Sequence, residues 1–149
     1  MKRHPILAAF SRDHHHALIT ARYIKKDAPT FRGMADTPEG KREYVLNFFK
    51  SHLQNHFRQE EAILFSTTGK LQPGMQKLLD ELITEHSMIV TLIQRIESQE
   101  KTESALHDLG SLLESHIRKE ERELFQQMQD KLSPADFLLL EQLLQQDHK

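Results

Sequence analysis

The sequence HFRQEEAILF, which begins at His56, returns in nearly the same form as HIRKEERELF, which begins at His116. Both stretches follow the pattern His-x-x-x-Glu-Glu-x-x-Leu-Phe. Residues four apart lie on one face of an α-helix, so His56 stacks with Glu60 and His116 stacks with Glu120. Such a pair offers a nitrogen to one metal ion and a carboxylate that bridges to a second. The repeat therefore predicts two helices that contribute equivalent ligands to one metal centre.

The remainder of the chain also has helical periodicity, and no alternating strand pattern occurs in it. Glycine and proline interrupt the periodicity at three places, Ala28–Gly40, Thr67–Gly74 and Pro134. Thr37 before Pro38 and the stretch SPAD, which begins at Ser133, are typical helix starts. The expected helices cover approximately residues 6–26, 38–66, 75–98, 103–131 and 133–147.

Short connections between long helices favour antiparallel neighbours. We therefore expect an all-α fold, an up-down-up-down four-helix bundle with an additional C-terminal helix. The length of 149 residues and the 38% hydrophobic content predict a single domain over residues 1–149. Its core bundle should cover about residues 4–131 and its extra helix about residues 133–147, which would pack on the bundle or on a second copy in a homodimer.

Each of the four long helices places a histidine on its apolar stripe. His14 interrupts the first stripe, and His86 lies in the middle of the third. Unpartnered polar groups cost about 1–3 kcal/mol each when buried, so these side chains should share a partner. At a rise of about 1.5 Å per residue, the histidines of different helices reach a similar height in the bundle. The candidate metal ligands are His14, His56, Glu60, His86, His116 and Glu120, and this imidazole and carboxylate set suits two iron ions, with manganese or zinc as alternatives.

With these motifs, the sequence resembles the hemerythrin-like, or HHE cation-binding, family. The resemblance extends from Asp13 to Phe125 and includes the stretch EHSMI, which begins at Glu85. It implies a four-helix bundle with a non-haem di-iron centre in which the glutamates bridge. Oxygen-carrying members of the family have His-x-x-x-His on the third helix, whereas Leu82 and Val90 flank His86 here at four residues. The departure leaves at least one ion with water, another side chain or an open position in place of the missing histidine.

Several assignments stay open at the level of sequence. His15 is an alternative to His14 on the first helix, while His16 should face solvent. His52 precedes His56 by one turn and could contact a ligand, replace the absent one or simply pack. Glu61 and Glu121 follow the bridging glutamates and point about 100° away, which suggests surface or supporting roles, with Glu121 in reserve for Glu120. We expect the other histidines to be surface residues, namely His4, His107 and His148.

The composition excludes several classes of function. The formal charge of -2 gives no reason to expect binding to nucleic acid or to a membrane surface. The chain has no cysteine, so thiolate and iron–sulfur chemistry are excluded. No stretch has the length of a signal core or of a membrane span, which leads us to expect a cytoplasmic protein.

The leading hypothesis is a di-iron protein that binds or senses a small diatomic gas, oxygen or nitric oxide. Alternatives are iron handling, an oxidase or peroxidase of the di-iron type, and a metal-free bundle that serves as an interaction module. Glu-x-x-His pairs, which ferritin-like oxidases use, are absent from this sequence, so a binding function is preferred over an enzyme.

Overall fold

The computed structural model describes residues 2–147, all of whose regular elements are helical. The first helix, α1, covers Pro5–Tyr23. The second long helix has five consecutive segments, of which η1 and η2 are π-helical: α2 (Pro38–Phe48), η1 (Phe49–Leu53), α3 (Gln54–Gln59), η2 (Glu60–Phe65) and α4 (Ser66–Leu71). The helix ends at its C-cap, Gln72, and the short 3-10 helix η3 (Pro73–Met75) follows. The remaining elements are α5 (Gln76–Glu97), α6 (Thr102–Lys119), the π-helical η4 (Glu120–Leu124), α7 (Phe125–Lys131) and α8 (Pro134–Asp147).

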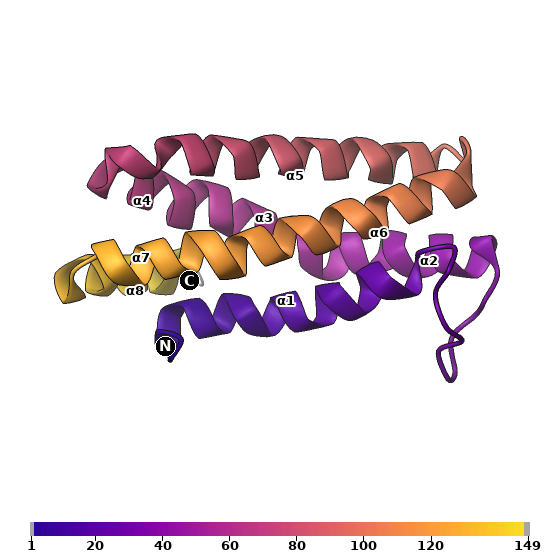
Figure 1. The fold of residues 1–149 in the computed structure, drawn as a ribbon, viewed down its shortest axis with the longest axis horizontal. Coiled ribbons are helices and arrows are strands. Elements are labelled where there is room, and N and C mark those ends of the chain that lie inside the picture. Colours follow the sequence, from indigo (N-terminus) through magenta and orange to yellow (C-terminus); the bar gives the residue numbers. More distant parts are fainter. Residues whose placement is uncertain (1, 148–149) are drawn as a thin grey trace.

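Consecutive long helices run in opposite directions and lie side by side, as Figure 1 shows. The longest connection joins α1 to α2 and extends from one end of the bundle (Figure 1). The Tyr23 hydroxyl at the end of α1 donates a hydrogen bond to the carbonyl of Ala35 in this connection, at 2.6 Å. The turn between α5 and α6 is short and uses positive φ at Gln99 and Lys101. The expected all-α bundle with an extra C-terminal helix is confirmed.

The helix starts follow their sequence signals. The Thr37 side chain accepts a hydrogen bond from the amide of Gly40 at 3.1 Å and caps α2. Ser133 and Asp136 exchange side-chain and backbone hydrogen bonds, which form a capping box at the start of α8. Each cap gives a hydrogen-bond partner to a backbone amide of the first helical turn, and so fixes where its helix begins.

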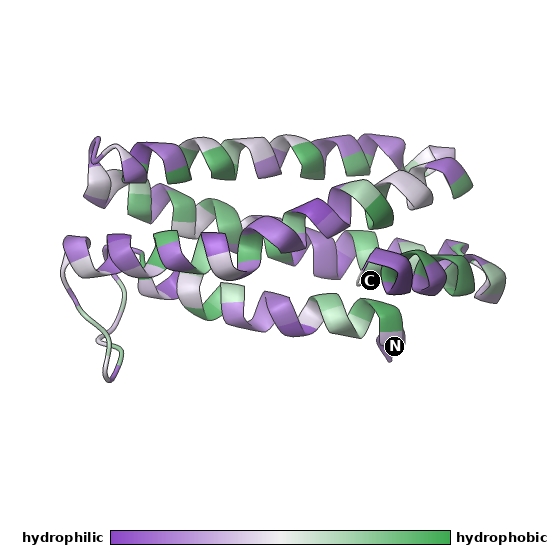
Figure 2. Cartoon of the chain, turned by 180° about the vertical axis from the view of Figure 1, so that it is seen from behind, coloured by the Kyte–Doolittle hydropathy of each residue, from purple (hydrophilic) through white to green (hydrophobic). Residues whose placement is uncertain are grey.

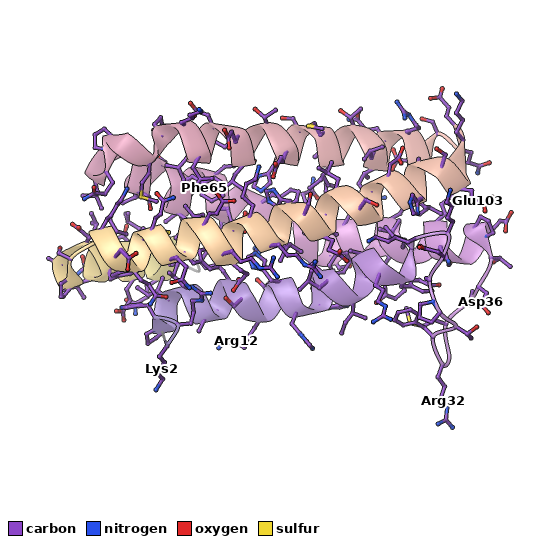
Figure 3. All side chains as sticks on the ribbon, viewed as in Figure 1. Lys2, Arg12, Arg32, Asp36, Phe65 and Glu103 are labelled. Atoms are coloured by element: carbon purple, nitrogen blue, oxygen red, sulfur yellow. The ribbon has the colours of Figure 1, made fainter. Side chains whose placement is uncertain are left out.

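The apolar interior consists of two clusters at different heights along the bundle. One contains Ala17, Ile89 and Leu113, and the other contains Leu7 and Leu124. Every long helix contributes to both clusters and carries hydrophobic and hydrophilic residues in alternation (Figure 2). Charged side chains such as Lys2, Arg12 and Arg32 extend away from the bundle, whereas Phe65 lies between helices (Figure 3). Buried polar residues occupy the level between the two clusters.

The π-helical segments change which residues of the second long helix face the interior. A constant 3.6-residue period places Phe49, His52 and Ile63 on the inner face, but His52 is exposed and the other two are only half-buried. In a π-helix the hydrogen bond runs to the fifth residue, so each segment rotates the following residues relative to an α-helix. Between Phe48 and Phe65 the buried positions are therefore Phe48, Leu53, His56, Phe57, Glu60, Leu64 and Phe65.

Helix α8 covers one end of the bundle. Phe137 and Leu140 are buried in the second apolar cluster, while Leu138 and Leu139 are 53% and 40% exposed. Its end is held to α3 by Asp147, which accepts hydrogen bonds from both Arg58 and Gln59. The predicted homodimer through this helix stays a prediction.

No described helix combines the length and the apolar character needed to cross a membrane.

Close packing of α1 against α6 depends on Gly110. A Cβ atom at this position would lie 2.5 Å from the carbonyl oxygen of Ala21 and 2.8 Å from the Lys25 side chain. Backbone atoms of a packed helix cannot move aside cheaply. Gly110 thus sets the separation of the helices that carry His14 and His116.

We expect Gly110→Ala to lower the free energy of unfolding by about 1–3 kcal/mol, because the added methyl group forces α1 and α6 apart. The matched control is Gly74→Ala, where a Cβ would meet no atom within 4 Å. Urea denaturation followed by circular dichroism measures both. Equal stability of the two variants would contradict the proposed role of Gly110.

Candidate metal centre

Six buried polar residues meet at the level between the two apolar clusters. Helix α1 contributes His14, and α5 contributes His86. The two sequence repeats contribute the others, and each π-helical segment η2 and η4 begins at a glutamate of the repeat. All are at most 5% exposed, and both glutamates are fully buried: His14, His56, Glu60, His86, His116 and Glu120. The structure thus brings together every residue predicted as a ligand.

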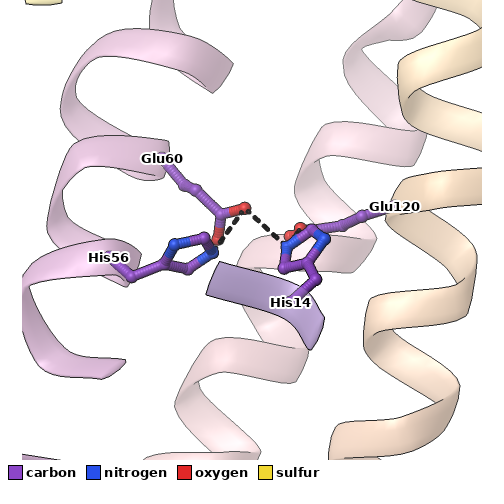
Figure 4. Close-up of side chains that lie close together, drawn as sticks. All are labelled: His14, His56, Glu60 and Glu120. Carbon is purple, nitrogen blue, oxygen red and sulfur yellow. Dashed lines mark ion pairs between the residues drawn. The ribbon is translucent and has the colours of Figure 1, made fainter. Parts of the chain in front are cut away.

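The two glutamates lie between two pairs of histidines. Oxygen Oε2 of Glu60 lies 3.2 Å from Nε2 of His56 and 3.8 Å from Nε2 of His14 (Figure 4). Its other oxygen, Oε1, lies 3.2 Å from Nε2 of His86. Each glutamate oxygen thus faces a different half of the centre.

Glu120 repeats this arrangement. Its Oε2 lies 2.8 Å from Nε2 of His14, and its Oε1 lies 3.0 Å from Nε2 of His116. One half of the centre therefore contains His14 and His56, the other contains His86 and His116, and both halves share Glu60 and Glu120. In each half the four donor atoms lie within 4.8 Å of one another.

The contacts between the histidines and the two glutamates are ion pairs, but most of the atoms that point into the centre make no hydrogen bond. Among residues 2–147, hydrogen-bond partners are lacking for Nε2 of His14, His86 and His116 and for both carboxylate oxygens of Glu60 and Glu120. Leaving a buried polar group unsatisfied costs about 1–3 kcal/mol, and more when the group is charged. Two atoms that bind the same metal ion at about 2.0–2.2 Å lie about 3 Å from each other. Most distances between a histidine Nε2 and a glutamate oxygen in the centre are close to this value. The donor set therefore suits cations bound between the residues.

The outer nitrogen of each histidine contacts a separate carboxylate. Nδ1 of His14 lies 2.6 Å from Glu121, and Nδ1 of His86 lies 2.7 Å from Glu61. These acids are the second glutamates of the two repeats. A carboxylate at Nδ1 fixes the ring orientation and directs Nε2 toward a metal.

The other two histidines take their outer partners from the residues that precede His14 and His86. Asp13 lies 3.1 Å from Nδ1 of His56, and Glu85 lies 2.7 Å from Nδ1 of His116. Sequence reasoning missed the roles of Asp13 and Glu85. The available signal was an acid immediately before each isolated histidine, which faces the neighbouring helix when the histidine points inward.

Two of the outer carboxylates are themselves held in place. Glu121 accepts hydrogen bonds from Ser11 and Arg3. Glu85 accepts a hydrogen bond from Lys119 at 2.7 Å. By contrast, Asp13 is 65% exposed and Glu61 is 42% exposed. In each half of the centre, therefore, one histidine contacts a fixed carboxylate and the other contacts a solvent-exposed one.

The surrounding carboxylates hold protons on the histidines when no cation is bound. Burial by itself lowers the pKa of His14, but Glu120, Glu121 and Glu60 outweigh it and raise that pKa to about 12. Against the same effect of burial, Glu60 and Asp13 raise the pKa of His56 to about 10. Burial would raise the pKa of Glu60, yet the neighbouring histidines hold it well below its usual range.

His116 behaves in the same way. Burial lowers its pKa, but Glu120 and Glu85 together raise it to about 9. In the metal-free centre, His14, His56 and His116 are consequently imidazolium ions, and Glu60 is a carboxylate ion. A cation that binds there must displace protons from the histidines.

The remaining histidines lie outside the centre. His15, His16 and His52 are exposed, so of the two candidates on α1 it is His14 that points inward, and His52 is not among the inward residues. His4 is half-buried because its ring caps α1 and stacks on Phe137 at 3.9 Å, which corrects the surface assignment. His107 is also half-buried and accepts a hydrogen bond from the amide of Lys26. His148 lies outside the described residues.

A small cavity of about 20 Å³ adjoins one side of the centre. Its inner wall includes His14, His56 and His116. Its outer wall includes Asp13 and His52, and the other lining residues are apolar: Ala17, Phe48, Leu53, Phe57, Leu113 and Ile117. The cavity has room for about one water-sized molecule, since about 10–15 Å³ is the minimum for a water.

Comparisons with known proteins agree with this geometry. The hemerythrin HHE cation-binding domain matches residues 6–128, which include all six inward residues and exclude α8. No curated protein and no solved structure matches the chain. The family match covers most of the chain, and the fold gathers histidines and glutamates that could hold a metal ion. This protein therefore belongs to the hemerythrin HHE cation-binding domain family.

Proposed function

We propose that this protein holds a non-haem di-iron centre and binds a small diatomic molecule, oxygen or nitric oxide, beside it. The observation that carries the proposal is the shared position of Glu60 and Glu120, each of which turns one oxygen to each pair of histidines. A single cation would leave half of these donors without a partner. Two cations give all of them one, with both glutamates as bridges.

Each residue then has a defined task. His14 and His56 would hold one ion, while His86 and His116 would hold the other. A pair of iron ions would supply the affinity for a diatomic ligand. The outer carboxylates keep each Nε2 turned inward, and the apolar clusters above and below exclude water from the centre.

The cavity and the missing ligand support a binding site for a gas. Helix α5 offers no second imidazole, because the positions one turn from His86 are Leu82, which is fully buried, and Val90. Each ion would therefore be held by two histidines and the two shared glutamates, and a further ligand would complete its coordination. The cavity beside His14 and His56 has the size of a small molecule, and six of its lining residues are apolar, so a diatomic gas can lie against them without losing hydrogen bonds to water.

Metal content is the first test. We expect two iron ions per chain in protein produced without a histidine tag, measured by elemental analysis. Glu120→Gln should weaken retention of both ions by more than about tenfold, because even the outer partners of metal ligands contribute about 10- to 100-fold. The matched control, Glu123→Gln, changes an exposed glutamate of the same segment and should keep both ions.

A second matched pair tests the helix α1 ligand. His14→Ala should lose one ion, whereas His15→Ala should retain two, because His15 is exposed. Well-folded protein with almost no iron, manganese or zinc would refute the metal centre and favour a metal-free bundle.

Gas binding is tested by optical spectroscopy. We expect the visible absorption of anaerobically reduced, iron-loaded protein to change on exposure to oxygen or nitric oxide. Ala17→Val should slow or prevent this change without loss of iron, because the added methyl groups occupy the cavity and not the ligand positions. A spectrum unaffected by both gases in iron-loaded protein would rule out this part of the proposal.

The pKa shifts predict how pH acts on the metal-free protein. A group whose pKa is raised by folding contributes stability that is complete below its unfolded value and is lost as the pH rises through the folded value. His116 and His56 rise from 6.5 to about 9 and about 10, so metal-free stability should fall between pH 6.5 and about 10. Glu60 stays ionised throughout this range and adds no opposing trend.

Metal binding should show the opposite trend. Uptake at pH 7 should release protons, and affinity should keep rising with pH well above the usual histidine range, because the imidazoles must deprotonate to bind. Calorimetry in buffers of different ionisation enthalpy measures the proton release. Unfolding curves with chelator at pH 6.5, 8 and 9.5 measure the stability, and a flat or rising series would contradict the assigned ion pairs.

A further inference from the structure

Side chains of types that can bind metals also lie outside the centre, near the outer wall of the cavity. Asp13 and His16 lie three residues apart on α1, and His52 lies opposite them on η1. The rings of His16 and His52 have centroids 5.4 Å apart, and both side chains are exposed. Two helices thus present two imidazoles and a carboxylate to solvent at one place on the seam between them.

Phe48 packs against both of these imidazoles. Its ring centroid lies 4.8 Å from that of His16 and 5.7 Å from that of His52. The hydroxyl of Tyr44 lies 3.3 Å from Nε2 of His16. These contacts hold the two rings near each other while leaving them open to solvent.

The cavity joins this exposed group to the buried centre. Asp13 and His52 line it from outside, and His14 and His56 line it from inside. Asp13, which is 65% exposed, also contacts Nδ1 of His56 through Oδ2 at 3.1 Å, so this carboxylate connects the outer wall of the cavity to a histidine of the centre. The other walls are apolar, so a cation on this route meets polar groups only at the two ends.

A cation cannot pass this cavity with its full water shell. A volume of about 20 Å³ holds about one water-sized particle. Ligands at the mouth that replace water one molecule at a time would therefore lower the barrier to entry. Imidazole is a suitable ligand for divalent iron, zinc, cobalt and nickel.

We propose that His16 and His52, with Asp13 beside them, form a surface capture site for a divalent transition-metal ion that then passes through the cavity into the centre. The inference rests on the proposed metal centre and adds its route of loading. Water completes the coordination at the surface, so binding there is weak and exchangeable.

The first experiment measures the rate at which Co²⁺ enters the buried centre of the metal-free full-length chain, by stopped-flow absorption. The double variant His16→Ala/His52→Ala should load at least about tenfold more slowly, since local ligand and charge clusters raise association rates by about 10- to 1000-fold. Its final metal content should equal that of the wild type. His15→Ala, an exposed neighbour on the same helix, is the matched control and should load at the wild-type rate.

The second experiment observes the surface site by itself. In a His86→Ala variant, which damages the far half of the centre, Co²⁺ should still broaden the imidazole resonances of His16 and His52 in NMR spectra. A brief wash with chelator should reverse the broadening. Unaffected resonances, or an unchanged loading rate in the double variant, would overturn the capture site.

The outcomes separate the two proposals. If the double variant loads two ions at the wild-type rate, the centre stands and the capture site is wrong. If the wild type takes up no buried metal while the resonances of His16 and His52 still broaden, the centre is wrong and the surface ions have no destination, so the loading route is overturned as well.

Discussion

Two glutamates buried side by side in a helical bundle are the constraint on which this structure depends. Glu60 and Glu120 are fully buried and face the same small volume. Two carboxylates in such a place repel each other and lose their hydration, so folding requires positive charge between or around them. His14, His56 and His116 supply it as imidazolium ions in the metal-free chain.

The position of the centre between two apolar clusters follows from the same constraint. Each helix buries aliphatic and aromatic residues on both sides of its polar residue, as Leu7 and Ala17 do around His14. The clusters hold the helices at a fixed separation and keep water out from above and below. Electrostatic attraction in the centre is therefore stronger than it would be in water, and the ligand positions are rigid.

An internal repetition explains how a short chain builds a complete site. Asp13-His14 and Glu85-His86 are equivalent dipeptides on α1 and α5, and the two His-x-x-x-Glu-Glu stretches are equivalent on the helices that follow. Each of the four outer acids contacts a histidine of another helix, so every inward histidine is oriented by a carboxylate of a neighbouring helix. The two halves differ at the cavity, which touches His14, His56 and His116 but not His86.

The sequence by itself determined the fold class, the helix ranges within a few residues and the six inward residues, because period, caps and the doubled motif are local signals. Only the tertiary structure decided the face of the second helix. The π-helical segments η1 and η2 shift its register, which exposes His52 and buries Phe48 and Leu53.

Tertiary structure also decided the partners of the outer carboxylates and the location of the cavity. In the sequence, the outer carboxylates cannot be told from ordinary surface charges, because nothing local relates each of them to its histidine. The pairs are Glu61 with His86, Glu85 with His116, Asp13 with His56 and Glu121 with His14. Their pairing depends on how neighbouring helices are rotated and separated, which close contacts such as Gly110 against Ala21 set. A property of two packed surfaces cannot be read from either helix alone.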